Sequence, residues 1–257
     1  MGTVGKAIFL LELFTAEEPE HGLSELARKA AFDKATTRRL LVSLATGGMV
    51  EQDAESRRYR LGAGLSRLAR IREMHFPFLK VTVPVARGLA QETGETIHVS
   101  EYSAGALATV HVELSARANR VNVDVGQLLP LHGTASGIAF LAFSRPTVME
   151  ACMRRAMAAF TPYTVTAPDA LMTAVQAAAA RGYSRSDQGY EEGVSSVAAP
   201  ILGVDGCAIG TLAIASPLSR IDDTIAEAHG RAAIDAAREI SARLSGEPVA
   251  AALERAS

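Results

Sequence analysis

Cationic and hydroxyl side chains recur at close spacing in one segment near the N-terminus of the chain. Arginine and lysine donate hydrogen bonds to guanine edges and to phosphates, while threonine and serine donate to phosphates and contact thymine methyl groups. No acidic residue interrupts the segment, so a helix face made of these side chains suits the major groove of DNA. The residues that we expect to contact DNA in this way are Lys34, Thr36, Arg38, Arg39 and Ser43.

A second group of cations follows in a segment with the pattern of a β-hairpin. Met49–Gln52 and Arg58–Leu61 alternate in polarity on either side of the turn-rich stretch Asp53–Arg57. We expect Tyr59 and Leu61 to face the neighbouring helices, which leaves the cations free to reach the sugar-phosphate backbone. The cations expected on the outer side and at the tip of this hairpin are Arg57, Arg58 and Arg60.

Three short amphipathic segments precede the hairpin and must position these side chains. Apolar residues at three- and four-residue steps predict a helix over Thr3–Thr15. Ser24 is placed to cap a second helix of about two turns, and Asp33 is placed to cap a third helix over Lys34–Ala45. Helix, tight turn, helix and hairpin in this order predict a winged helix-turn-helix over residues 1–62.

The charge of the chain is unevenly distributed. The formal net charge is −2, but Ser24–Arg72 carries 11 Lys and Arg against 5 Asp and Glu, whereas the chain after His75 carries 14 against 18. A cationic helix face or a charged hairpin tip, taken alone, is most often ordinary solvated surface. The succession of three helices and a basic hairpin in one short module favours DNA binding over that explanation.

Other residue types that carry chemistry form no recognisable site in the sequence. His98, His111 and His132 include no pair with the His-x-x-x-His spacing of a metal site. Cys152 and Cys207 are too few and too distant for a disulfide framework, which fits a reducing compartment. No uncharged apolar run approaches the roughly 18 residues that cross a bilayer. We therefore expect a cytoplasmic protein with no metal, no cofactor and no membrane contact.

A set of acidic residues, Asp187, Glu191 and Glu192, is placed to do acid–base work. Nothing nearby supplies a recognisable nucleophile or metal partner, and carboxylates in a loop are more often structural. We do not expect an enzyme, although a ligand-binding hydrolase or isomerase stays open as the alternative. The cationic helix and hairpin distinguish the two classes, since a catalyst has no need of them.

Six segments of the chain carry motifs that recur together in one known family. They are Gly22–Ala30, Lys34–Leu41, Arg58–Gly62, Leu129–Gly137, Gly189–Val194 and Val197–Pro200. These motifs closely resemble those of the isocitrate lyase regulator family, IclR. The resemblance implies a transcriptional regulator that dimerises through its N-terminal domains, often forms tetramers, and senses small organic acids in a GAF-like domain. It places Arg39 at the family's characteristic recognition-helix arginine, and it places Thr37 toward the helix packing and away from DNA.

An α+β architecture in two domains follows from the pattern and the resemblance together. We expect a winged helix-turn-helix in residues 1–62, a linker helix in residues 63–76 and a GAF-like effector-binding domain in residues 77–257. In the last of these, helices surround one sheet. The expected strands cover residues 96–102, 106–113, 120–125, 194–202 and 208–215, and the expected helices cover residues 78–93, 137–143, 147–158, 169–181 and 222–244.

The segment His132–Gly137 is the most informative part of the second domain. Thr134 or Ser136 can cap the helix that follows, and free backbone N–H groups at that end would stabilise a ligand carboxylate. A capped, buried helix with no ligand is the plain alternative, and the resemblance favours the ligand. The effector contacts that the resemblance implies are Ala135, Ser136, Asp187 on a neighbouring loop, Val194, Ser196, Ala213 and Ala215.

Two departures from the family pattern bear on the effector. Ser196 stands where many relatives have cysteine, and Ala213 and Ala215 stand where several have serine. The loss of two hydroxyl groups makes this wall less polar. We therefore expect a small organic acid with an apolar or aromatic part, in preference to one as small and oxygenated as glyoxylate.

The expected partners are double-stranded DNA, the effector and further copies of the chain. In a homodimer or homotetramer, two recognition helices about 34 Å apart fit successive major grooves of a pseudo-palindromic operator. Effector binding then shifts the population of domain arrangements that match this spacing. Whether the effector releases or tightens the DNA, and whether the protein represses or activates, stays open.

Overall fold

The computed structural model describes residues 1–246, which form two compact units. The first unit spans Met1–Pro77, and the second begins at Phe78. Each unit has a hydrophobic core of its own. None of the helices in the described residues is long and apolar enough to span a membrane.

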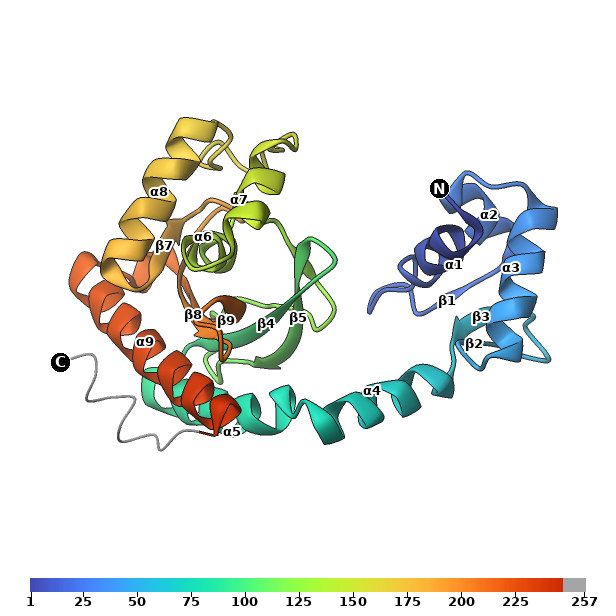
Figure 1. Cartoon of the computed structure of the whole chain (residues 1–257), viewed down its shortest axis with the longest axis horizontal. Helices are drawn as coiled ribbons and strands as arrows, with labels where there is room; N and C mark the ends of the chain where they lie inside the picture. The colour runs from blue at the N-terminus through green and yellow to red at the C-terminus, as the bar shows by residue number, and fades with distance from the viewer. Residues whose placement is uncertain (247–257) are drawn as a thin grey trace. The chain divides into compact units, whose positions relative to one another are not determined.

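Four helices and a small antiparallel sheet make up the first unit (Figure 1). The elements are α1 (Thr3–Leu11), β1 (Glu20–His21), α2 (Leu23–Ala30), α3 (Lys34–Thr46), β2 (Val50–Gln52), β3 (Tyr59–Leu61) and α4 (Ala63–His75), and the strand order is β1-β3-β2. Leu10, Leu26 and Leu41, one from each of the first three helices, are fully buried and form one core with Val50 and Tyr59 of the sheet. The winged helix-turn-helix prediction is confirmed.

The ends of the first two helices differ from the prediction. Helix α1 ends at Leu11 and not at Thr15, because the chain turns between these residues. Helix α2 is capped by Gly22 and not by Ser24, which lies inside its first turn. The Glu25 carboxylate reaches back and accepts a hydrogen bond from the Gly22 N–H at 3.3 Å.

The sheet of this unit contains one strand that the sequence pattern does not indicate. Strand β1 is two residues long and pairs with Tyr59 and Arg60 of β3. The prediction that Leu61 faces the helices is wrong, since its side chain is 45% exposed. Strand β1 does not extend as far as Leu61, which pairs only with Val50 of β2.

Glycines pack the joint between the β2–β3 hairpin and α4. A Cβ atom on Gly62 would lie 2.3 Å from the Gly48 carbonyl oxygen, and one on Gly64 would lie 2.6 Å from the same atom. This close approach lets the Gly62 N–H donate to the Met49 carbonyl oxygen at 2.8 Å. The Gly64 N–H donates to the Gly48 carbonyl oxygen at 2.9 Å. The start of α4 is therefore hydrogen-bonded directly to the turn that leads into β2.

A six-stranded antiparallel sheet lies at the centre of the second unit, with the order β6-β5-β4-β9-β8-β7 (Figure 1). The strands are β4 (Thr96–Ser103), β5 (Ala106–Glu113), β6 (Leu128–Leu129), β7 (Ser184–Asp187), β8 (Val194–Leu202) and β9 (Ala208–Pro217). The helices are α5 (Phe78–Thr93), α6 (Ala135–Ala142), α7 (Pro146–Met153), α8 (Pro168–Arg181), the short η1 (Leu218–Arg220) and α9 (Asp223–Ser245). Helices α5 and α9 cover one face of the sheet, and α6 covers the other with α8 packed on it. This arrangement confirms the α+β prediction.

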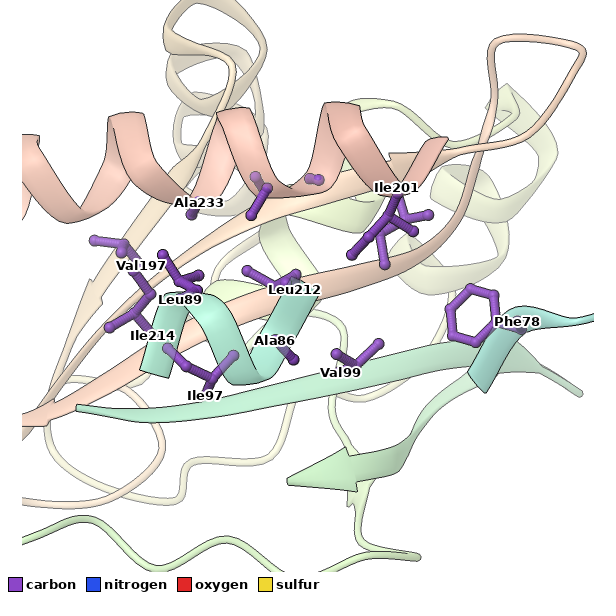
Figure 2. Close-up of a cluster of buried hydrophobic side chains, with 14 residues drawn as sticks. Phe78, Ala86, Leu89, Ile97, Val99, Val197, Ile201, Leu212, Ile214 and Ala233 are labelled. Carbon is purple, nitrogen blue, oxygen red and sulfur yellow. The ribbon is translucent and has the colours of Figure 1, made fainter. Parts of the chain in front are cut away.

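Alternation along the strands gives the two faces of this sheet different chemistry. Val99 of β4, Val197 of β8 and Leu212 of β9 are buried against α5 and α9 (Figure 2). Burial of each such side chain contributes about 1.5–3 kcal/mol to folding. The next residues on β4 and β9, His98 and Ala213, pair across the strands and face the α6 side. The aliphatic face anchors the fold, and the opposite face leaves space for a cavity.

The second unit departs from the prediction in several elements. The two-residue strand β6 was not predicted, and the helix expected over residues 147–158 ends at Met153. Residues 120–125 form an irregular loop and not a strand, and the Val121 carbonyl oxygen accepts a hydrogen bond from the Thr96 hydroxyl at 2.8 Å in place of a strand partner. Strand β7 is absent from the prediction because it is short and polar. Asp187, expected on a loop, is the last residue of β7 and pairs with Ser195 of β8.

Gly137 allows the first turn of α6 to lie against the segment before it. A Cβ atom at this position would lie 2.3 Å from the Leu131 carbonyl oxygen. No other residue fits there unless the backbone moves. The start of α6 is therefore held at a fixed position in the second unit.

Candidate functional site

The first turn of α3 determines which of its side chains face outward. The Asp33 carboxylate accepts a hydrogen bond from the Thr36 N–H at 2.7 Å, which confirms the predicted N-cap and holds the pKa of Asp33 below its usual value. Thr37 is buried and donates its hydroxyl hydrogen to the Asp33 carbonyl oxygen at 2.9 Å. Leu40 and Leu41 are buried in the core of the unit. The opposite side of α3 is left to solvent.

The cations of α3 lie on this outer side. Lys34, Arg38 and Arg39 are exposed, and none of their side chains forms an ion pair or hydrogen bond with any described residue. Thr36 is half-buried. Ser43 is exposed, and its hydroxyl donates to the Arg39 carbonyl oxygen at 3.1 Å. The three cations are therefore available to a phosphate or a base edge without breaking an internal contact.

Two of the three hairpin arginines are bound within the first unit. Arg58 Nη2 donates to a carbonyl oxygen of β1 at 2.6 Å and to the Glu25 carboxylate of α2 at 3.3 Å. Arg60 forms an ion pair with Glu51 of β2 at 3.4 Å. Arg57 lies exposed in the turn with a φ of 59°, and within residues 1–246 it has no ion-pair partner. Arg57 is thus the hairpin cation most available to DNA.

The carboxylate of Glu25 joins the hairpin to α2. Its Oε1 lies 3.2 Å from Nδ1 of His21, which is fully buried. Contact with His21 and the hydrogen bond from the Gly22 N–H hold the pKa of Glu25 below its usual value. Because Arg58 shares this carboxylate, the guanidinium serves to hold the hairpin in place as well as to present positive charge.

A small cavity opens on the α6 side of the six-stranded sheet. Its volume is about 70 Å³. On this scale a water needs roughly 10–15 Å³, and a cavity of about 150 Å³ in another protein binds benzene. The described residues that line the cavity are His98, Val121, Asn122, Val123, Gln127, Leu129, Thr134, Ala135, Ser136, Ser186, Gly189, Tyr190, Glu191, Val194, Ser196 and Ala215. Neither lysine nor arginine is among them.

The N-terminus of α6 faces this cavity with free amides. Of the two residues expected as caps, Thr134 and Ser136, it is Thr134 that caps the helix, and its Oγ1 accepts a hydrogen bond from the Gly137 N–H at 2.9 Å. The Thr134 carbonyl oxygen accepts from the Ile138 N–H at 3.0 Å. The amides of Ala135 and Ser136 precede these two and have no acceptor within the helix. They present the positive end of the helix dipole to whatever occupies the cavity.

The cavity brings together five of the seven effector contacts that the family resemblance implies. These five are Ala135, Ser136, Val194, Ser196 and Ala215. Asp187 is not part of the lining, and its carboxylate accepts hydrogen bonds from Ser195 at 2.6 Å and from Arg185 at 3.1 Å. Ala213 is fully buried and packs against Ala139 of α6, so it lies behind the cavity wall.

Sequence reasoning missed a wall of the cavity that comes from the loop between β5 and β6. Val121 and Gln127 line the cavity from this loop, and Gln127 Nε2 donates to the Tyr190 hydroxyl oxygen at 3.2 Å. The base of the loop is held by Glu95, whose buried carboxylate binds Arg117 at 2.7 Å. No local pattern marks these residues, because the contacts join segments that are distant in sequence.

His98 is a further lining residue that sequence reasoning missed. Its side chain is 6% exposed, and its Nδ1 has no hydrogen-bond partner among the described residues. Burial lowers the pKa of His98 to about 4, so the imidazole is neutral at neutral pH. An unpaired buried polar atom costs about 1–3 kcal/mol, which asks for an explanation. The available signal was a histidine between Ile97 and Val99 in an otherwise aliphatic strand.

The described residues hold no candidate metal centre. No three His, Cys, Asp or Glu side chains in residues 1–246 lie close enough to bind an ion together. His111 contacts the Glu113 carboxylate at 3.0 Å, and His132 contacts the Ala158 carbonyl oxygen at 2.9 Å. These histidines therefore have structural partners of their own.

Both units match known protein-family profiles. The profile of the IclR helix-turn-helix domain matches residues 3–54. The profile of the bacterial transcriptional regulator IclR C-terminal domain matches residues 74–242.

Individual relatives match over most of their length. The glycerol operon regulatory protein of Streptomyces coelicolor is 30% identical over 84% of this chain and 85% of its own. The crystal structure of an IclR transcriptional regulator from Silicibacter sp. TM1040 is 37% identical, covers 96% of this chain and 98% of its own, and has a TM-score of 0.87. An IclR homolog from Microbacterium hydrocarbonoxydans, solved with 4-hydroxybenzoate, is 23% identical, covers 95% and 99%, and shares the fold with a TM-score of 0.80.

Proposed function

The chain belongs to the IclR family of bacterial transcriptional regulators, and from this premise we propose that α3 and the β2–β3 hairpin bind operator DNA under the control of a small organic acid. The observation that carries the proposal is the outer side of α3. Arg38 and Arg39 are exposed there and have no partner in the described part of the chain, while the other side of the helix is buried. Unpaired cations on a rigid helix suit contacts with a duplex.

The proposed contacts fall into two classes. The side chains that enter the major groove are Lys34, Thr36, Arg38, Arg39 and Ser43, and those that meet the sugar-phosphate backbone are Arg57, Arg58 and Arg60. Arg57 contributes more than Arg58 or Arg60, because the latter two are already paired with carboxylates. Residues 1–62 read DNA, residues 63–76 link, and residues from 77 onward bind the effector.

Self-association places two copies of α3 on one pseudo-palindromic operator. Apolar side chains stand exposed on α1, at Val4 and Ile8, and on α4, at Leu68 and Ile71. Their spacing puts each pair on one helix face. Such faces are suited to burial against a second copy, which supports a homodimer. The further association into a homotetramer is proposed from the family alone.

The effector that we propose is a small organic acid with an apolar part. Its carboxylate would lie at the free amides of Ala135 and Ser136, and its apolar part would meet Val194 and Ala215. Ser196 supplies a hydroxyl group to the same space. At about 70 Å³ the cavity favours a compact aliphatic acid. An aromatic acid such as the 4-hydroxybenzoate of the Microbacterium homolog would require the cavity to enlarge.

The enzyme alternative is not retained. The relatives are named as regulators of transcription, among them an acetate operon repressor of Salmonella typhimurium. Transcription regulation, not catalysis, is the function of the family to which the chain belongs.

The test begins with selection of a duplex from a random DNA pool by the full chain, followed by fluorescence anisotropy on that duplex. Arg39→Ala should weaken binding by about 1–3 kcal/mol if Arg39 contacts a base edge. Arg231→Ala is the matched control, since this exposed arginine lies on α9 in the second unit. The proposal would be contradicted if no preferred duplex were selected. It would also be contradicted if wild type, Arg39→Ala and Arg231→Ala bound the duplex with equal affinity.

A thermal-shift screen of short organic acids tests the effector. Compact acids with an aliphatic part should raise the melting temperature of the full chain, since a ligand that binds only the folded state stabilises it. Stabilisation only by the smallest and most polar acids would contradict the proposed chemistry of the cavity.

A further inference from the structure

His98 is a buried polar residue in the cavity that no structural contact explains. It lies on β4 between Ile97 and Val99, both of which are buried in the aliphatic core on the other face of the sheet. Its partners across the strands, Ala213 of β9 and Val112 of β5, have no polar side-chain atom. The Nδ1 atom accordingly has no hydrogen-bond partner in the described residues, although the ring lines the cavity and is only 6% exposed.

We propose that His98 determines effector specificity, by exchanging a hydrogen bond between its imidazole and a hydroxyl group of the bound acid. The proposal rests on the proposed function, in which this cavity binds a small organic acid. It assigns to His98 a role that is separate from binding the carboxylate.

The other polar groups of the cavity indicate why the partner is a hydroxyl group. The carboxylate of the acid has its own site at the amides of Ala135 and Ser136, which carry the positive end of the α6 dipole. Because burial keeps His98 neutral, its imidazole adds no charge that would attract an anion. A neutral imidazole offers one donor and one acceptor, and a hydroxyl group can match either of them.

Two other histidines of the second unit, His111 and His132, give the contrast. His111, on the neighbouring strand β5, is paired with Glu113. His132 is paired with the Ala158 carbonyl oxygen. No hydrogen bond within the described residues holds the ring of His98: its Nδ1 is buried and unpaired, and its ring lines the cavity, where a group of the ligand can meet it.

Two acids that differ by one hydroxyl group test the proposal. Calorimetric titration of the full chain with butyrate and with each enantiomer of 3-hydroxybutyrate gives a ratio of affinities. We expect wild type to bind the preferred enantiomer of 3-hydroxybutyrate with an affinity at least about 10-fold higher than its affinity for butyrate. A site built for a hydroxyl group rejects the analogue without it. In His98→Leu the two acids should bind within about 3-fold of each other. Any change in cavity volume acts on both acids and cancels in the ratio.

Two further variants separate specificity from structure. His111→Leu removes a histidine that is outside the cavity lining, so it should keep the wild-type preference. His98→Gln retains a donor and an acceptor and should keep part of the preference. A ligand-free melting curve provides the control for folding. His98→Leu should melt at or above the wild-type temperature, because it loses no internal hydrogen bond of Nδ1.

The outcomes separate this proposal from the proposed function. Wild type that binds both acids with equal affinity overturns the role of His98 and leaves acid sensing intact. The same follows if the preference persists in His98→Leu, or if that variant melts well below wild type. Wild type that binds neither acid overturns acid sensing and the role of His98 together, while operator binding is decided by its own assay.

Discussion

The outer side of α3 and the cavity beside α6 place their functional groups in opposite environments. Arg38 and Arg39 are charged, exposed and without internal partners among the described residues, so the fold does not depend on them. The cavity is lined mainly by uncharged groups on buried elements, such as Ser136 and Ala215, and Glu191 is the one acidic side chain among the described lining residues. On the outer side of α3, the side chains that bind DNA are not needed for folding. At the cavity, the same side chains serve both folding and effector binding.

This difference decides how variants at the two regions must be interpreted. A change on the outer side of α3 that weakens DNA binding reports on the contact itself. A change in the cavity alters packing and binding together, so each cavity variant needs a stability measurement beside it.

The largest effect is expected for removal of both α3 arginines. Arg38→Ala combined with Arg39→Ala should weaken operator binding by about 2–6 kcal/mol, if each arginine contributes as a base or phosphate contact. The free energy of unfolding should change by no more than about 0.5 kcal/mol, because no described internal contact is lost. Anisotropy and urea denaturation measure the two quantities. A large loss of stability would show that the two arginines also stabilise the fold, so that DNA binding and stability are not separate in this region.

A glycine variant beside the cavity should lose folding stability, in contrast to the arginine variants of α3. Gly137→Ala places a Cβ atom 2.3 Å from the Leu131 carbonyl oxygen and should destabilise the second unit by about 3 kcal/mol. Gly88→Ala on α5 is the control, since nothing lies within 4 Å of its Cβ position and alanine favours a helix. It should be neutral or stabilising by up to about 1 kcal/mol. Equal stability of both variants in urea denaturation would refute the close approach at α6.

The pH dependence of stability should carry a contribution from His98. The folded-state pKa of about 4 lies below the unfolded value of 6.5, so the unfolded chain takes up the proton first as the pH falls. Stability is therefore lost between about pH 6.5 and pH 4, and between pH 7 and pH 5 the loss is about 2 kcal/mol. Wild type should lose this much more than His98→Leu in urea denaturation at the two pH values. Parallel losses would mean that the imidazole is not buried in solution.

The smallest of the predicted effects is the loss of stability on removal of the N-caps of α6 and α3. Thr134→Ala should destabilise the second unit by about 1 kcal/mol, because the buried Gly137 N–H loses its acceptor. Asp33→Ala should have a smaller effect, since water can reach the Thr36 N–H in the exposed first turn of α3. Thermal melts of both variants provide the comparison. A greater loss at Asp33 would contradict the contrast in burial.

Much of the first region could be predicted from sequence because its determinants are local. The N-cap at Asp33 and the exposed arginines follow from residues within one or two helical turns, whereas the buried position of Thr37 was implied by the family resemblance. Strand β1 could not be predicted in this way. It is too short to show alternation, and it exists only because β3 lies beside it.

The cavity was less predictable because its walls come from distant segments. The first turn of α6 is a local motif, and its cap was expected at Thr134 or Ser136. Residues 120–125 alternate like a strand, yet their place at the cavity depends on hydrogen bonds such as that from Thr96. His98 lies on β4 and Tyr190 lies between β7 and β8, yet both line the same cavity, and neither position has a local signature.

The glycine contacts at the end of the hairpin restrict how far α4 can move relative to the hairpin. Gly62 and Gly64 are hydrogen-bonded to the hairpin backbone at a separation that admits no side chain. A flexible hinge at this point would let α4 turn while the hairpin stayed still. These contacts instead attach the start of α4 to the chain that enters β2, so we expect the two to move together.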